Sequence, residues 1–196
     1  MRHNEVRDLS AELLRQVCRD VNIEPGLIPL SGQRFSASAN HEANARLDVS
    51  ARDFWSPMDK AFFDVRITHP MASSNRSKPL PTLYKAHEDE KKRVYNERII
   101  EVEKATFTPL VFSTSGGTGK ECSRFLKRLA SLISIKRNEE YADVISYVRR
   151  RLRFCILRTT LIAIRGYRGK RFPKSAADVS TADFNMIAAD ANRCSD

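Results

Sequence analysis

Two aspartates occupy the middle of segments whose residue types favour β-strands. Asp48 lies in residues 46–50 (RLDVS), and Asp64 lies in residues 61–67 (AFFDVRI). A carboxylate between apolar strand residues is unfavourable unless a cation or a donor pairs with it. Two such acids on neighbouring strands could share one Mg²⁺ or Mn²⁺ ion, whose remaining positions water and phosphate oxygens would fill. Such an ion generates hydroxide and stabilises charge on a phosphodiester, so we predict Asp48 and Asp64 as metal ligands.

A basic residue is the third component that this chemistry needs. Arg66 follows Asp64 by two positions, so both side chains point to the same face of a strand. Arginine stays protonated, so Arg66 can hold a phosphate but cannot act as a base. The charged helix that follows offers Lys91 and Lys92, and Lys91 has Tyr95 one turn later on the same face. We predict Lys91 as the catalytic lysine, with Lys92 and Tyr95 as additional candidates.

A simpler interpretation needs no metal. Asp48 and Asp64 would then be ordinary strand charges that form salt bridges with neighbours such as Arg46 and Arg66. Taken without further motifs, the two acids favour this interpretation.

Hydrophobic periodicity and turn residues divide the chain into helices and strands. We expect helices at residues 3–21, 82–103, 120–135 and 139–165, and strands at residues 46–50, 61–67 and 107–112. This order predicts an α/β fold with a small mixed sheet flanked by helices and a long C-terminal helical extension. The first two strands should be antiparallel, and the third should join them across the helix at 82–103.

Three parts follow one another along the chain. Residues 1–136 should form the α/β domain, and residues 137–166 should form a basic helix packed on it. Residues 167–196 are polar, and we expect a poorly ordered tail there.

The composition excludes a membrane-spanning protein and favours one that binds nucleic acid. The chain has 196 residues, of which 41% are hydrophobic, and none of its apolar runs approaches the roughly 20 residues of a membrane-spanning helix. The net charge of +10 suggests an anionic partner, most commonly a nucleic acid. The residues that we expect to contact DNA are Arg66, Lys92, Arg149, Arg150 and Arg153.

The glycine-rich segment at residues 115–121 (SGGTGKE) looks like a phosphate-binding P-loop, since it lies between a predicted strand and a predicted helix. The P-loop pattern needs glycine at position 114 and Ser or Thr at position 121, where the chain has Thr114 and Glu121. We therefore interpret the segment as a tight turn before a helix, whose N-terminus could still hold a DNA phosphate.

The order of the motifs resembles a known family. The segments LDVSA, FFDVRI, KAHEDEKKRVY and FTPLVFSTSGG follow one another in the first two thirds of the chain. This pattern resembles the restriction-like endonuclease domain, of the PD-(D/E)xK class, at the C-terminal end of the reverse transcriptases of some non-LTR retrotransposons. It is also similar to related transposon-derived segments in animal genomes. The resemblance covers roughly residues 2–166.

The resemblance assigns roles by position. Asp48 matches the acid of the PD motif, with Leu47 where the family often has proline, and Asp64 matches the second acid. Lys91 and Tyr95 match the K-x-x-x-Y motif on the helix. Some related nucleases add a glutamate from the first helix, and the candidates here are Glu5 and Glu12.

The resemblance also implies a restriction-endonuclease-like fold and a Mg²⁺- or Mn²⁺-dependent endonuclease that nicks DNA so that reverse transcription can be primed. A DNA substrate implies the nucleus, and an upstream reverse transcriptase module is the implied partner. The family usually carries a zinc knuckle before this domain, but His3 alone is no complete zinc site. Two other functions stay open: a basic DNA-binding module without turnover, and a domesticated protein-interaction domain.

Overall fold

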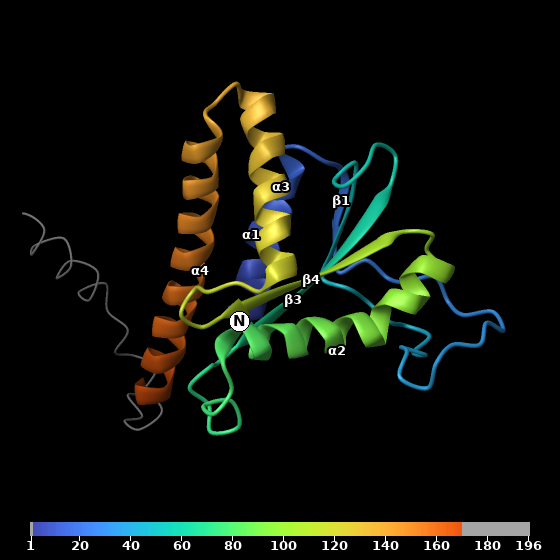
Figure 1. Cartoon of the computed structure of the whole chain (residues 1–196), viewed down its shortest axis with the longest axis horizontal. Coiled ribbons are helices and arrows are strands. Elements are labelled where there is room, and N and C mark those ends of the chain that lie inside the picture. The colour runs from blue at the N-terminus through green and yellow to red at the C-terminus, as the bar shows by residue number, and fades with distance from the viewer. Residues whose placement is uncertain (1, 170–196) are drawn as a thin grey trace, which may run out of the picture. The chain divides into compact units, whose positions relative to one another are not determined.

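The computed structural model describes residues 2–169 (Figure 1). Its elements in chain order are α1 (Arg2–Arg15), β1 (Arg19–Ile23), β2 (Val49–Arg52), β3 (Lys60–Thr68), α2 (Leu80–Glu101), β4 (Thr106–Ser113), α3 (Lys120–Arg137) and α4 (Tyr141–Gly169). The predicted α/β fold with a small mixed sheet flanked by helices is confirmed.

The chain divides after Thr160 into a compact first unit, which contains the sheet, and a second unit. The second unit is described only at residues 161–169, which are the end of α4. Most of the predicted polar tail at 167–196 lies outside the described residues, from residue 170 onward. Among the helices described, none combines the length and hydropathy that crossing a membrane requires.

The four strands lie in sequence order in the sheet. β1 and β2, and β2 and β3, are antiparallel, whereas β3 and β4 run parallel from the pair Ala61–Thr106 to the pair Thr68–Ser113. A parallel connection needs a crossover, and α2 is that crossover. The predicted antiparallel pair, with a third strand added across the charged helix, is therefore confirmed.

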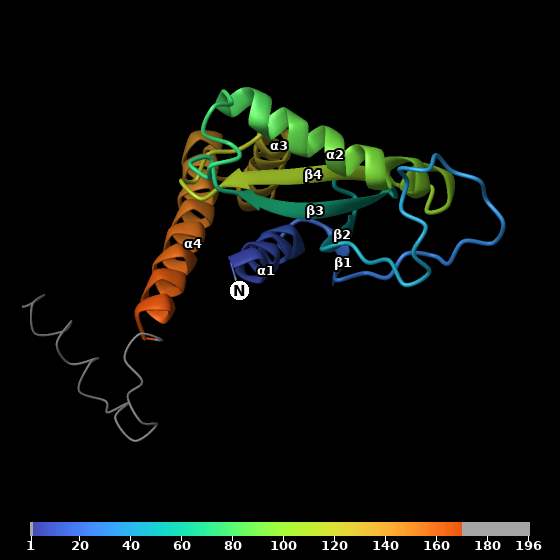
Figure 2. The ribbon, with the colours of Figure 1, turned by 90° about the horizontal axis from the view of Figure 1, so that it is seen from below.

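The two faces of the sheet are covered by different helices, with α1 on one face and α2 on the other (Figure 2). Alternate residues of β3 point to opposite faces. Phe63 and Val65 join the apolar cluster that contains residues of α1, α3 and α4, whereas Phe62 joins the cluster beneath α2. Asp64 is two residues from Phe62, so its side chain points to the same face of the sheet and lies under α2, where Asp64 is only 6% exposed.

The prediction of one helix over residues 3–21 was wrong at its C-terminal end. α1 ends at Arg15, and the chain turns into β1, an edge strand paired with β2. Val17 and Val21 pack against the main apolar cluster from the turn and from β1, not from a helix. Asp20 has a φ of 49°, and the register of β1 shifts beside it. A short irregular strand of this kind shows no clean alternation that periodicity could detect.

A buried arginine ties α2 to the long loop that leads into β2. Arg98 is fully buried, and its Nη1 donates to Asn40 Oδ1 at 2.9 Å and to Glu42 O at 2.7 Å. Its Nη2 donates to Ile28 O at 2.9 Å. The loop that these bonds hold ends at Asp48, so Arg98 helps to fix the path of the chain into the predicted site.

We expect Arg98→Met to lower the free energy of unfolding by about 2–4 kcal/mol, because it removes the buried guanidinium that donates to Ile28, Asn40 and Glu42 of the loop. Urea unfolding followed by circular dichroism measures the change. Arg93→Met is the matched control, since Arg93 is exposed on the same helix, and its effect should stay within about 0.5 kcal/mol. Equal effects of the two substitutions would contradict the role given to Arg98.

Candidate functional site

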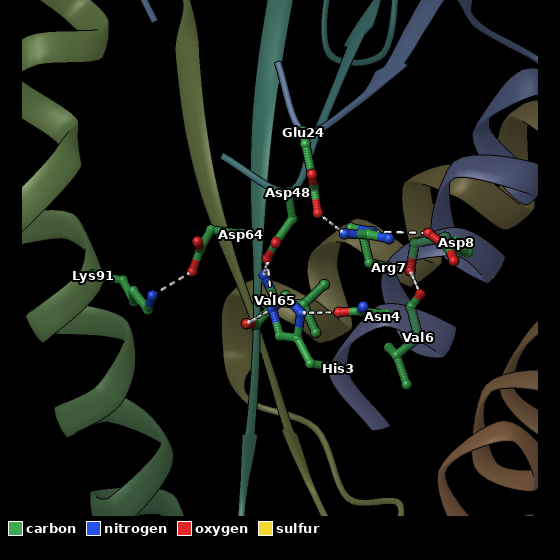
Figure 3. A network of polar contacts seen from close by, with 11 residues as sticks. His3, Asn4, Val6, Arg7, Asp8, Glu24, Asp48, Asp64, Val65 and Lys91 are labelled. Atoms are coloured by element: carbon green, nitrogen blue, oxygen red, sulfur yellow. Dashed lines mark hydrogen bonds and ion pairs between the residues drawn. The ribbon is translucent and has the colours of Figure 1, made fainter. Parts of the chain in front are cut away.

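Asp64 and Lys91 meet between β3 and α2 (Figure 3). Lys91 Nζ lies 2.8 Å from Asp64 Oδ2, and the two side chains are 20% and 9% exposed. Oδ2 receives no hydrogen bond of regular geometry within the described residues, so this contact is an ion pair. A carboxylate that is nearly buried needs a partner charge to remain ionised, and Lys91 provides it.

Asp48 reaches the same place from the chain just before β2, not from the middle of a strand as predicted. β2 begins at Val49, and the chain bends at Asp48. Continuing the register from the pair Val49–Phe63 by one step would set Asp48 opposite Asp64. Instead, Asp48 Oδ2 accepts the backbone N–H of Val65 at 2.6 Å. In a longer β2, a backbone carbonyl would have accepted the Val65 N–H. Because the Asp48 side chain accepts it instead, the pairing of β2 with β3 begins only at Val49.

A histidine that the sequence motifs did not place in the site is the next neighbour of Asp48. His3, in the first turn of α1, has its Nε2 2.9 Å from Asp48 Oδ2 and 3.0 Å from Val65 O (Figure 3). The hydrogen bond with Asp48 raises the pKa of His3, against the opposing effect of burial. No spacing or motif relates residue 3 to residues 48 and 65, so the sequence held no signal for this contact.

α1 also holds the backbone of Asp48 indirectly. The Glu24 N–H donates to Asp48 O at 2.9 Å. The Glu24 carboxylate pairs with Arg7 of α1 (Figure 3). Helix α1 therefore supports the main chain of Asp48 through Arg7 and its side chain through His3.

One oxygen of each of the two carboxylates could bind an external ligand. The contacts of Asp48 and Asp64 are all made by Oδ2, and neither Oδ1 accepts a hydrogen bond within residues 2–169. Two carboxylate oxygens fit Mg²⁺ or Mn²⁺, which keeps several waters and takes phosphate oxygens of a substrate. No group of three or more His, Cys, Asp and Glu side chains is placed to hold a metal within residues 2–169. Asp48 and Asp64 would thus supply the side-chain ligands, and water and phosphate would complete the shell.

Burial raises the pKa of Asp64, because its charged form loses hydration under α2. The charge of Lys91 acts in the opposite direction, and the charge of Asp48 raises the pKa of Asp64 again. When the folded-state pKa of an acid lies above its unfolded value, its contribution to stability is greatest at low pH and is lost as pH rises through the raised pKa. A cation beside Asp64 would offset this loss.

Tyr95 and Lys92, predicted as additional candidates, lie in different settings. Lys91 Nζ is 5.6 Å from the centre of the Tyr95 ring, so these two residues share one face of α2, and burial raises the pKa of Tyr95. Lys92 pairs instead with Glu121 of α3, with 2.5 Å between Nζ and Oε1. The K-x-x-x-Y spacing therefore identifies Lys91, and not Lys92, as the lysine on the same face of α2 as Tyr95.

Arg66 lies two residues after Asp64 on β3 and is half-buried. It forms no ion pair within the part of the chain that the structure describes, so it is not the salt-bridge partner that the simpler interpretation offered to the two acids. Asp64 pairs with Lys91 instead. The guanidinium of Arg66 is thus not committed to a protein acid in residues 2–169.

The structure does not bring the two predicted glutamates of α1 to the acids. Glu12 Oε1 accepts a hydrogen bond from Arg151 Nη1 of α4 at 3.0 Å. Burial, and then the charge of Glu5, raise the pKa of Cys155 in α4, and no hydrogen bond or ion pair joins Glu5 to either acid within residues 2–169. From α1 it is His3, not a glutamate, that contacts Asp48.

The three predicted DNA-contacting arginines of α4 are exposed. Arg149 and Arg153 line a small hollow beside the glycine turn, together with Phe112 and Thr118. Arg150 donates to the carbonyl of its own helix at Ser146, over 3.3 Å. The predicted DNA contacts therefore come from β3, α2 and α4.

The N-terminus of α3, where the sequence allowed a DNA phosphate, already holds a carboxylate of the protein. Glu88 Oε1 accepts the Glu121 N–H at 2.9 Å in the first turn of α3. A Cβ at Gly119 would collide with this carboxylate, so any larger residue at this position would have to displace Glu88. A phosphate at the same position would have to displace Glu88.

We expect an NMR titration of the Asp64 carboxyl carbon to give a pKa above the ordinary 3.8. Lys91→Met should raise it further, because the attraction of the ammonium group for the carboxylate is lost. Lys92→Met is the control, since Lys92 pairs with Glu121, and it should leave the pKa of Asp64 unchanged. A pKa at or below the ordinary value would contradict the expectation that burial outweighs the charge of Lys91.

No family model, curated protein or solved structure matches the chain.

Proposed function

We propose that the chain is a metal-dependent DNA endonuclease domain of the restriction-like class, derived from a non-LTR retrotransposon. The order of its motifs supports this, because LDVSA, FFDVRI and KAHEDEKKRVY each contribute one of the three central residues. The net charge of +10 suits a polyanionic substrate. A DNA substrate implies the nucleus, and the proposed origin implies a reverse transcriptase module as partner.

The meeting of Asp48, Asp64 and Lys91 is the observation that carries the proposal. Lys91 contacts Asp64, and Asp48 is bonded to the N–H of the very next residue, Val65. A structural salt bridge would account for the contact between Lys91 and Asp64. It would not account for the second carboxylate, Asp48, whose charge raises the pKa of Asp64 further in addition to burial. Two acids held together in a covered place are typical of a cation site.

Each side chain then has one task. Asp48 and Asp64 would hold Mg²⁺ or Mn²⁺, and such an ion would supply hydroxide and neutralise charge on the phosphate. Lys91, beside Asp64, orients the attacking water or stabilises the charge that develops on the phosphodiester. Arg66, on the same face of β3, holds a neighbouring phosphate and cannot act as a base.

We expect the chain to nick supercoiled plasmid DNA in the presence of Mg²⁺ or Mn²⁺. Asp64→Asn and Lys91→Gln should each lower the nicking rate by about a hundredfold or more, because they remove a metal ligand and a charge-stabilising group. Gel separation of nicked and supercoiled plasmid measures the rate.

Lys92→Gln is the matched control for this assay, because Lys92 is adjacent in sequence but pairs with Glu121. It should change the rate by no more than a few-fold, through weaker DNA binding. Equal nicking by the wild type and Asp64→Asn would identify a contaminating nuclease. Folded wild-type protein that binds DNA and never nicks it would rule out the endonuclease.

A second function, a basic DNA-binding module without turnover, is favoured by the contacts that the acids already have. Asp64 is paired with Lys91, and Asp48 accepts hydrogen bonds from Val65 N–H and His3. These contacts can hold the acids in place without a metal ion. The module would keep the fold and the positive charge and use Arg66 as a phosphate contact.

Both functions predict that Arg66 contributes to DNA affinity. Arg66→Gln should weaken binding to a short duplex and reduce the slope of log affinity against log salt by about one unit. Fluorescence anisotropy across a salt series measures both quantities. Arg19→Gln is the control, because Arg19 is engaged by Asp53 on the surface, and its slope should match the wild type. Absence of any DNA binding would leave the domesticated protein-interaction domain.

A further inference from the structure

Beyond the pair Val49–Phe63, where β2 begins, the edge of β3 lacks a strand partner, and two side chains take that place. The N–H and C=O of one strand residue point to the same edge, and at Val65 that edge faces the chain before β2. Asp48 Oδ2 accepts the Val65 N–H at 2.6 Å, and His3 Nε2 lies 3.0 Å from Val65 O. His3 Nε2 is also 2.9 Å from Asp48 Oδ2. Asp48, Val65 and His3 therefore form a closed set of contacts (Figure 3).

The chemistry of this set fixes the role of the imidazole nitrogen. A carboxylate and a peptide carbonyl are both acceptors, so Nε2 must carry the hydrogen and donate it. A protonated Nε2 has no lone pair for a metal, so the nitrogen that faces Asp48 is not a metal ligand in this arrangement. What it can do is hold Asp48 Oδ2, together with Val65 N–H.

Helix α1 does not depend on this contact for its place in the fold. Val6, Leu13 and Leu14 are fully buried against the sheet, and Arg7 binds Glu24. The His3 side chain is 43% exposed, so it adds little to that packing. Its hydrogen bonds are made at the acid, and they leave Oδ1 of Asp48 free of contacts within residues 2–169.

We propose that His3 is a positioning residue, which fixes the Asp48 carboxylate through Oδ2 so that Oδ1 is presented to the metal ion. The proposal rests on the endonuclease function given above. Hydrogen bonds behind a ligating carboxylate set its orientation, and their loss commonly weakens metal binding by about 10- to 100-fold. The motif-based candidates Glu5 and Glu12 would have been ligands, whereas His3 acts through Asp48.

The test is Mn²⁺ binding to the full chain, measured by electron paramagnetic resonance of the free ion, without DNA and without turnover. His3→Ala should raise the Kd for Mn²⁺ about tenfold or more. His3→Gln should restore it to within about threefold, because the glutamine amide reaches the Nε2 position and can donate to both acceptors. Asn4→Ala is the control, since Asn4 touches only the far side of the ring, at 3.4 Å from Nδ1, and should leave the Kd unchanged.

A Kd for His3→Ala equal to that of the wild type, even with a lower melting temperature, would overturn the proposal and leave His3 as a structural contact. If His3→Ala unfolds the chain, the Kd values for Mn²⁺ of His3→Asn and His3→Gln are compared instead. The asparagine amide is one carbon short, so equal Kd values for the two variants would overturn the proposal. The endonuclease function itself would fail a different test: the wild type would then bind Mn²⁺ no more tightly than Asp64→Asn does.

Discussion

Burial of the Asp64 carboxylate beneath α2 is the constraint on which the rest of the site depends. A strand covered on both faces cannot leave a charge without a partner, so α2 has to carry Lys91 opposite the acid. The buried side of the helix is accordingly mixed, with Leu83, Glu88, Arg98 and Ile99 all buried. Polar groups in a covered interface tolerate few geometries, so they fix the position of the helix along the strand more tightly than apolar contacts would.

The late start of β2, at Val49, has the second largest influence. It leaves one edge of β3 uncovered at Val65, and it frees Asp48 to turn its side chain toward that edge. Three separate stretches of chain then meet around β3: the start of α1, the residue before β2, and the middle of α2. Arg98, in α2, holds the loop that leads to Asp48, the residue before β2.

Sequence reasoning reached the residues whose positions follow from local periodicity. Asp64 sits within a strongly apolar strand, and Lys91 has the helical spacing from Tyr95 that places both on one face, so both settings could be predicted. Asp48 was predicted as a residue but not in its setting, because a bend caused by a side chain leaves no periodic trace. β1 was missed for a related reason, since its register is irregular.

His3 and Arg98 mark where such reasoning ends. The partners of His3 lie on β3 and before β2, and those of Arg98 lie in a polar loop. Contacts of this kind depend on how whole elements pack, and no residue type or spacing reports them. Lys92 shows the converse case, because it fits the charged-helix pattern as well as Lys91 does and yet pairs with α3.

The parallel pairing of β3 with β4 bears on the order in which the chain can fold. Ala61 pairs with Thr106 and Thr68 with Ser113, so every rung of this ladder closes a loop that contains all of α2. Closing such a loop costs chain entropy before any contact compensates it, whereas the β2–β3 pair and α2 are local structures. The sheet is therefore completed late, and until then the inner edge of β3 stays open beside Phe62 and Phe63.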